Sequence, residues 1–83
     1  MKGENEMIIS IFYSKITGEI YTATMAENKY TYDRFGKFAK DMEQILDILY
    51  ISGNDGLYKD LKNYYIDLET KALIRKDDNI RYL

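Results

Sequence analysis

Paired carboxylates are the side chains of this 83-residue chain whose type and spacing could do chemistry. Asp67 and Glu69 stand two positions apart in a stretch expected to be a β-strand, so both would lie on one face of it. Two neighbouring carboxylates can serve as a general acid and a general base. Asp77 and Asp78 form a second pair near the end of the chain. Because the residues that alternate with Asp67 and Glu69 are apolar, we interpret the first pair as a solvated strand face, and we expect no enzyme.

Histidine and cysteine, which carry much of protein catalysis and metal binding, are both absent from the sequence. Nearly every zinc site, thiol catalysis and the usual general base near neutral pH need one of them. The glycine-rich residues 52–56 lack the Gly-Lys-Ser/Thr ending of a phosphate loop and the closing glutamate of a calcium loop. The sequence therefore predicts neither a cofactor nor a metal site.

The charged residues are nearly balanced, with 12 basic and 14 acidic side chains and a formal net charge of -2. This balance disfavours an electrostatic nucleic-acid binder and equally a polyanionic mimic of DNA. The sequence has no apolar run of about 18 residues, and its first six residues are polar and do not resemble a signal segment. We expect a soluble cytoplasmic protein that binds neither nucleic acid nor membrane.

The element expected to organise the fold is an amphipathic helix over residues 33–51. Its apolar residues recur three and four positions apart and would share one helical face. They are Phe35, Phe38, Ala39, Met42, Ile45, Leu46 and Leu49. Asp33 is the expected N-cap, with Thr31 as the alternative, and the glycines of residues 52–56 would end the helix. We interpret Gly36, within the first turn, as a close approach to a strand in preference to the approach of a partner.

A first β-hairpin is predicted before this helix. Residues 7–14 form a short strand with apolar side chains on both faces, so this strand should be central or covered. Gly18 can take the left-handed conformation that closes a type I turn with a bulge. Residues 19–25 then return with clean alternation. Residues 29–32 either add a short third strand or lead into the helix.

A second hairpin is predicted near the C-terminus. Asp55 would cap a short helix over residues 57–63, and residues 64–68 and 72–76 would form two strands. Lys71 falls where the first hairpin has Gly18, so a positive φ is expected there.

Together these elements predict one α+β domain over residues 7–83, after a flexible tail of residues 1–6. Its antiparallel sheet would have four or five strands, with the main helix packed on one face and the short second helix before the last hairpin. Residues 77–83 would either dock on the sheet or form a short contact for a partner.

The two hairpins carry a resemblance to a known group of proteins. Residues 11–20 read Ile-Phe-Tyr-Ser-Lys-Ile-Thr-Gly-Glu-Ile, and residues 65–73 read Tyr-Ile-Asp-Leu-Glu-Thr-Lys-Ala-Leu. This pattern resembles the small uncharacterised accessory proteins of bacteriophages that infect Gram-positive bacteria. The resemblance implies a phage origin, a place in the host cytoplasm and a role through binding, either in the virion or as an inhibitor of a host defence or host enzyme. Lys71 departs from the glycine that the pattern prefers.

Tyrosine is abundant, with nine residues against no tryptophan, and it is enriched where proteins touch one another. We therefore expect a non-enzymatic protein that binds a host protein, for example as an inhibitor. The alternative is a virion or assembly component that associates with its own copies through unpaired sheet edges. The oligomeric state is left open. The residues expected to bind the partner are Tyr30, Tyr32, Asn54, Asp55, Tyr64 and Tyr65.

Overall fold

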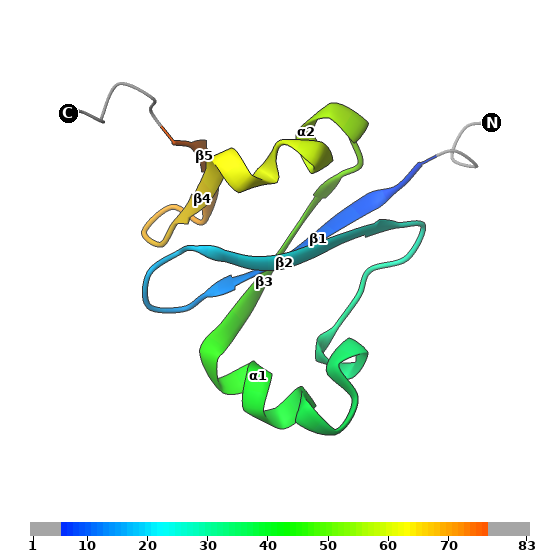
Figure 1. Cartoon of the computed structure of the whole chain (residues 1–83), viewed down its shortest axis with the longest axis vertical. Coiled ribbons are helices and arrows are strands. Elements are labelled where there is room, and N and C mark those ends of the chain that lie inside the picture. Colours follow the sequence, from blue (N-terminus) through cyan, green and yellow to red (C-terminus); the bar gives the residue numbers. More distant parts are fainter. Residues whose placement is uncertain (1–5, 77–83) are drawn as a thin grey trace.

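The computed structural model describes residues 6–76 and shows an α+β fold, as predicted (Figure 1). The strands in chain order are β1 (Ile8–Ser14), β2 (Ile20–Ala26), β3 (Leu46–Ser52), β4 (Tyr64–Asp67) and β5 (Ala72–Arg75). They form two antiparallel sheets instead of one, a three-stranded sheet of order β2-β1-β3 and a two-stranded sheet of β4 and β5. Residues 1–5 of the tail expected at residues 1–6, and the docking question for residues 77–83, fall outside the described residues.

β1 is the central strand of the larger sheet. In its register Ile11 lies opposite Ala23 of β2 and opposite Leu49 of β3. Ile9 and Ile11 are completely buried on one face, and Phe12 is completely buried on the other. The prediction that this strand is covered on both sides is therefore confirmed.

The turn between β1 and β2 also forms as predicted. Gly18 has a φ of 82°, and its N–H donates to the Ser14 carbonyl over 3.0 Å. The Ser14 hydroxyl accepts the N–H groups of Ile16 and Thr17, each over 3.1 Å. A register shift between Phe12 and Tyr13 marks the accompanying bulge.

The long helix predicted over residues 33–51 is wrong in its extent. The structure has a 3-10 helix η2 (Tyr32–Phe38), a short helix α1 (Ala39–Ile45) and then the strand β3. Residues 48–51 form a continuous apolar run, which suits a covered strand as well as a helix, and pairing with the open edge of β1 satisfies the main chain of β3. None of the residues in η2 and α1 is buried, so neither of these two helices packs an apolar face flat on the sheet as the predicted helix would.

Two details at the start of this region also differ from expectation. The Thr31 hydroxyl accepts the N–H of Asp33 over 3.3 Å, so Thr31, the alternative, is the N-cap. Gly36 takes a φ of 60° and a ψ of -126°, which interrupts the helix. A Cβ atom on Gly36 would have no heavy atom within 4 Å, so the expected close approach to a strand is wrong. Glycine serves here because its backbone reaches a conformation closed to other residues.

One face of the sheet is covered by the C-terminal part of the chain. Helix α2 (Asp55–Lys59), the 3-10 helix η3 (Leu61–Asn63) and the small sheet lie on this side, and α1 lies on the other side (Figure 1). The N-cap of α2 is Asn54 and not Asp55, because the Asn54 side chain accepts the N–H of Leu57 over 3.0 Å. The core between these layers contains five buried residues, which are Ile9, Ile11, Tyr13, Leu61 and Ile66.

The opposite face of the sheet is covered by aromatic side chains. Phe35 meets the ring of Phe12 edge to face with 5.2 Å between centroids, and Tyr32 meets it at 6.2 Å. The guanidinium of Arg34 lies 5.7 Å above the Phe12 ring and 5.4 Å from the Phe35 ring. Aromatic pairs of this geometry add about 0.5–1.5 kcal/mol beyond their buried area. They hold the first turn of η2 on the sheet.

Two main-chain contacts join the two sheets. Glu19 forms an isolated antiparallel bridge with Tyr65, and the N–H of Ile66 donates to the Gly18 carbonyl over 2.8 Å. Beyond this junction β4 and β2 are not paired. No helix within residues 6–76 is long and apolar enough to span a membrane.

Candidate functional site

Tyr30, one of the expected partner-binding residues, is fixed on the aromatic face of the sheet. Its N–H donates to the hydroxyl of the buried Ser10 over 3.0 Å, and its carbonyl accepts the hydroxyl of Tyr50 over 2.6 Å. Its ring lies 5.9 Å from the guanidinium of Arg34 and is 38% exposed. The backbone of Tyr30 is therefore structural, and its ring is partly available.

Tyr32 has a structural position at the border of the sheet. Its hydroxyl donates to the Leu46 carbonyl over 2.8 Å. Burial, followed by the negative charges of Asp47 and Glu43, raises the pKa of this phenol above its ordinary value. We find Tyr32 at an edge strand and not on a free surface.

The pairing of β3 with β1 determines which main-chain groups of β3 face its outer edge. Lys15 N–H donates to the Ile45 carbonyl over 3.0 Å, and Gly53 N–H donates to the Met7 carbonyl over 2.7 Å. Hydrogen-bonded pairs in an antiparallel ladder recur at every second residue, so the odd-numbered residues of β3 bond to β1. The main-chain groups of its even-numbered residues point outward.

Two side chains occupy this outer edge where β3 begins. The Tyr32 hydroxyl donates a hydrogen bond to the outward carbonyl of Leu46, and the Asp47 carboxylate accepts one from the outward N–H of Ile48 over 3.0 Å. A strand that added here would have to displace both groups. The edge of β3 is therefore closed at its start, as edge strands of natural proteins often are.

Asn54 and Asp55 lie together at the far end of the large sheet. The Asn54 side chain is engaged as the cap of α2, and Asp55 is exposed in its first turn. They border a hollow of about 1170 Å³, which is also lined by Glu27, Lys29 and Tyr50. The Lys29 ammonium lies 5.0 Å above the Tyr50 ring. Acidic, basic and uncharged polar groups therefore line this hollow together.

Tyr64 lines a second hollow, a groove of about 500 Å³ between β2 and the C-terminal layer. We call it the tyrosine groove. The lining residues that matter below are Tyr21, Ala23, Tyr58, Lys62, Tyr64 and Lys76. Tyr65, the neighbour of Tyr64, pairs with Ile74 and bridges to Glu19. The six expected residues are thus spread over three regions, and only Tyr64 lies in this groove.

The floor of the groove includes the outer edge of β2. Because the odd-numbered residues of β1 bond to β3, its even-numbered residues bond to β2, and Ser10 lies opposite Thr24. The main-chain groups of Ala23 and Met25 therefore point outward, Ala23 within the groove and Met25 farther along the same edge, where it lines the first hollow. The Ala23 carbonyl receives only a long contact of 3.4 Å from the Tyr58 hydroxyl. Among the described residues these two outward positions have no main-chain partner.

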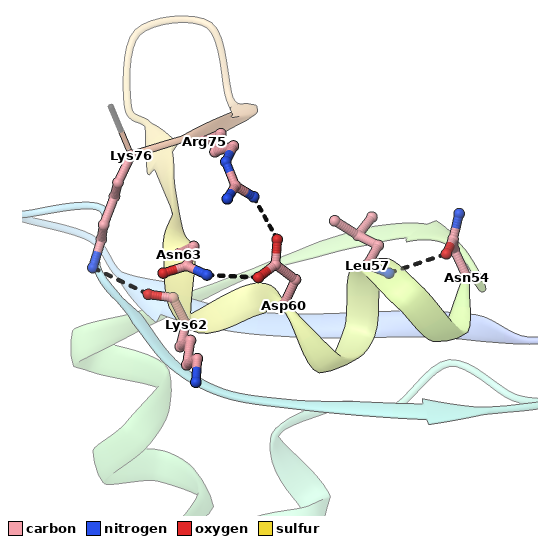
Figure 2. Close-up of polar contacts among 7 residues, drawn as sticks. All are labelled: Asn54, Leu57, Asp60, Lys62, Asn63, Arg75 and Lys76. Atoms are coloured by element: carbon pink, nitrogen blue, oxygen red, sulfur yellow. Dashed lines mark hydrogen bonds and ion pairs between the residues drawn. The ribbon is translucent and has the colours of Figure 1, made fainter. Parts of the chain in front are cut away.

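A polar clamp holds the far wall of the groove, as Figure 2 shows. The Asp60 carboxylate accepts the side-chain amide of Asn63 over 2.6 Å and forms an ion pair with Arg75. These hydrogen bonds, that of Asn63 first and that of Arg75 second, lower the pKa of Asp60 below its ordinary value. The Arg75 guanidinium also lies 5.6 Å from the centroid of the Tyr64 ring. The clamp thereby ties η3 to β5 and positions Tyr64.

The two lysines of the groove are held close to each other. The Lys76 N–H donates to the Asn63 carbonyl over 2.7 Å, and the Lys76 ammonium reaches the Lys62 carbonyl at 3.4 Å (Figure 2). Within residues 6–76 neither lysine forms an ion pair. No carboxylate in this part of the chain therefore neutralises either charge.

The carboxylates considered for catalysis have a local role in the described part of the chain. The Asp67 carboxylate accepts the N–H of Glu69 over 3.0 Å inside the second turn. Asp77 and Asp78 lie outside the described residues. Residues 6–76 contain no cluster of three or more metal-binding side chains.

Sequence reasoning missed most of the tyrosine groove. Tyr21 lies in the predicted return strand of residues 19–25 and Tyr58 in the predicted helix of residues 57–63, and neither was among the residues expected to bind the partner. No spacing rule links Tyr21 to Tyr64, because the junction between Gly18 and Ile66 brings them together. The one signal that the sequence offered was the place of Tyr21 in a strand of alternating residues, which is an edge strand in the structure.

Comparisons with protein-family models, with curated proteins and with solved structures found no match to this chain.

Proposed function

We propose that this domain acts without catalysis, by binding another protein through the tyrosine groove. The observation that supports this proposal most is the convergence of Tyr21, Tyr58 and Tyr64 from three elements in one groove. Tyr21 is 60% exposed. Tyrosine presents a large, rigid contact area at a low cost in conformational entropy, and it is enriched among the residues that dominate binding energy.

The resemblance to phage accessory proteins suggests the kind of partner. We propose a host protein in the host cytoplasm, either a defence protein or an enzyme, whose surface is occupied and inhibited. The polar clamp supports this role because it fixes the wall of the groove before binding, and preorganised contacts lose less entropy on association.

Self-association is the second candidate function, and one observation favours it. Phe38 and Ile45 are 52% and 53% exposed on η2 and α1. Apolar side chains exposed together on one segment can mark an interface. The closed start of the β3 edge argues against assembly by strand pairing at Leu46 and Ile48.

Two measurements separate these candidates. Light scattering after size-exclusion chromatography, over about a hundredfold range of concentration, gives the mass in solution. Affinity capture from host lysate then compares the natural chain with Tyr21→Ala, and with a Phe38→Ser/Ile45→Ser variant as the matched control. We expect a monomer that captures a host protein, with capture lost in Tyr21→Ala and kept in the control. A defined oligomer that the control variant disrupts would instead support assembly.

A further inference from the structure

The tyrosine groove combines an open strand edge with two lysines that form no ion pair within residues 6–76. We propose that it takes an extended segment of the partner as an added β-strand along Ala23 and Met25, and that Lys62 and Lys76 select an acidic residue in that segment. This inference rests on the proposed function, because it names the mode of binding and the chemistry of the partner at the same groove.

The unpaired edge is the first argument. β4 pairs with the start of β2 only through the Glu19–Tyr65 bridge and the bond from Ile66 to Gly18. The chain before Tyr64 belongs to η3, which does not continue the ladder. Within residues 6–76 no strand therefore pairs with β2 at Ala23 and Met25, and a second extended segment can pair with their outward main-chain groups.

The contrast between the two edges of the sheet is the second argument. At β3 the Tyr32 hydroxyl and the Asp47 carboxylate occupy the outward main-chain groups at 2.8 and 3.0 Å. At β2 the comparable contact within residues 6–76 is the 3.4 Å approach of Tyr58 to the Ala23 carbonyl. That contact is long enough to be exchanged for a better-placed N–H of a partner.

Charge complementarity is the third argument. Lys62 and Lys76 line the groove, and Glu19 is its single acidic lining residue. The nearby carboxylate of Asp60 is already engaged by Arg75 and Asn63, so it does not neutralise the lysines. An aspartate or glutamate of the added strand would complete an ion pair that residues 6–76 leave unmade.

The probe for the test is a displayed library of random peptides of about eight residues, the typical length of a strand. Selection uses the natural chain, and elution uses high salt so that charge-dependent binders are recovered. We expect the selected peptides to alternate β-branched residues and to carry aspartate or glutamate. Selected peptides without acidic enrichment would overturn the charge assignment while leaving binding at the groove intact.

Two variants follow the selected peptide by isothermal titration. Lys62→Glu/Lys76→Glu should weaken binding by roughly tenfold or more, since attraction becomes repulsion at two positions. Lys15→Glu/Lys40→Glu changes the net charge by the same amount at two positions outside the groove. This variant should leave the affinity within about twofold. Equal weakening by both variants would show that only the overall charge matters.

Main-chain pairing is tested by modifying the peptide, because this leaves the domain and its folding unchanged. Each amide of the peptide is N-methylated in turn. An added strand bonds through every second residue, so alternate methylations should abolish binding and the others should be tolerated. Uniform tolerance, or loss without alternation, would overturn strand addition. If no selected peptide depends on Tyr21 while Tyr21→Ala still abolishes capture of a host protein, the inference is wrong and the proposed function stands. If capture also does not depend on Tyr21, both are wrong.

Discussion

Gly18 and Ile66 meet through their main chains and thereby join the two hairpins. The N–H of Ile66 donates to the Gly18 carbonyl over 2.8 Å, and a Cβ atom on Gly18 would stand 2.1 Å from the Ile66 carbonyl oxygen. The φ of Gly18 is also 82°, in the region that favours glycine. One residue therefore closes the first turn and sets the distance between β2 and β4, on which the tyrosine groove depends.

Gly18→Ala should lower the free energy of unfolding by roughly 2–4 kcal/mol, because the backbone strain adds to the overlap with Ile66. Urea denaturation followed by circular dichroism measures the change. Gly56→Ala is the matched control, since it lies in α2 and its added Cβ would be 3.4 Å from the nearest atom, the Asn54 Oδ1. The control should be neutral or stabilise by up to about 1 kcal/mol. Equal stabilities of the two variants would contradict the close contact.

Lys71→Gly should be neutral or stabilise the fold by up to about 1 kcal/mol. Lys71 has a φ of 62°, a conformation that costs a non-glycine residue roughly 1–2 kcal/mol, offset in part by the entropy of glycine in the unfolded chain. Thermal unfolding measures the change. Thr70→Gly is the control, since it relieves no backbone strain and should lower Tm. A clearly lowered Tm for Lys71→Gly would show that the second turn does not hold Lys71 under strain.

Tyr32→Phe should open the edge of β3. Loss of the hydroxyl leaves the Leu46 carbonyl without its 2.8 Å partner and should cost about 1 kcal/mol of stability. We expect self-association that grows with concentration in light scattering. Tyr50→Phe removes a hydroxyl of the same kind, bonded to the Tyr30 carbonyl and not to a main-chain group of β3, and should stay monomeric. Identical masses for both variants would exclude a protective role for Tyr32.

Acid should weaken the polar clamp at Asp60. The hydrogen bonds from Asn63 and Arg75 lower the pKa of this carboxyl in the folded chain below its ordinary 3.8. A carboxyl whose pKa is lower in the folded chain than in the unfolded chain stabilises the fold fully at pH values above its unfolded pKa. This stabilisation is lost as the pH falls through its folded pKa. The stability difference between the natural chain and Asp60→Asn should therefore be constant near neutral pH and shrink below about pH 4. A difference that is constant down to pH 2 would contradict this ionisation.

The first hairpin could be predicted from the sequence because its causes are local. Ser14 and Gly18 define the turn within five residues, and the alternation of the return strand sets its faces. The same reasoning located the second hairpin and the positive φ of Lys71. Turn chemistry acts between near neighbours, so one sequence is enough to read it.

The extent of the long helix could not be predicted in this way because residues 46–52 fit two structures. Leu46 and Leu49 suit a helical stripe, and the apolar run of residues 48–51 suits a covered strand equally well. The open edge of β1 decides the outcome, since β3 satisfies its main chain there. A contact between segments more than 30 residues apart leaves no mark in local spacing.

The groove was beyond sequence reasoning for the same reason. Tyr21 and Tyr64 come together through the junction of two hairpins, and Lys76 reaches Lys62 only after the second hairpin has closed. The expected residues Tyr30 and Tyr32 were tyrosines of the right kind, but hydrogen bonds commit them to the sheet.

Amide hydrogen exchange at Ala23 and Met25, measured by NMR with and without a selected acidic peptide, tests the central claim most directly. Both N–H groups point outward from β2 and have no main-chain partner among the described residues. We predict that peptide binding slows their exchange at least roughly tenfold, as a hydrogen bond to an added strand requires. Tyr50 and Ser52, on the outer edge of β3, should be unaffected. Unchanged exchange at Ala23 and Met25 in the fully bound domain, or slowing at Tyr50 and Ser52 instead, would contradict the account.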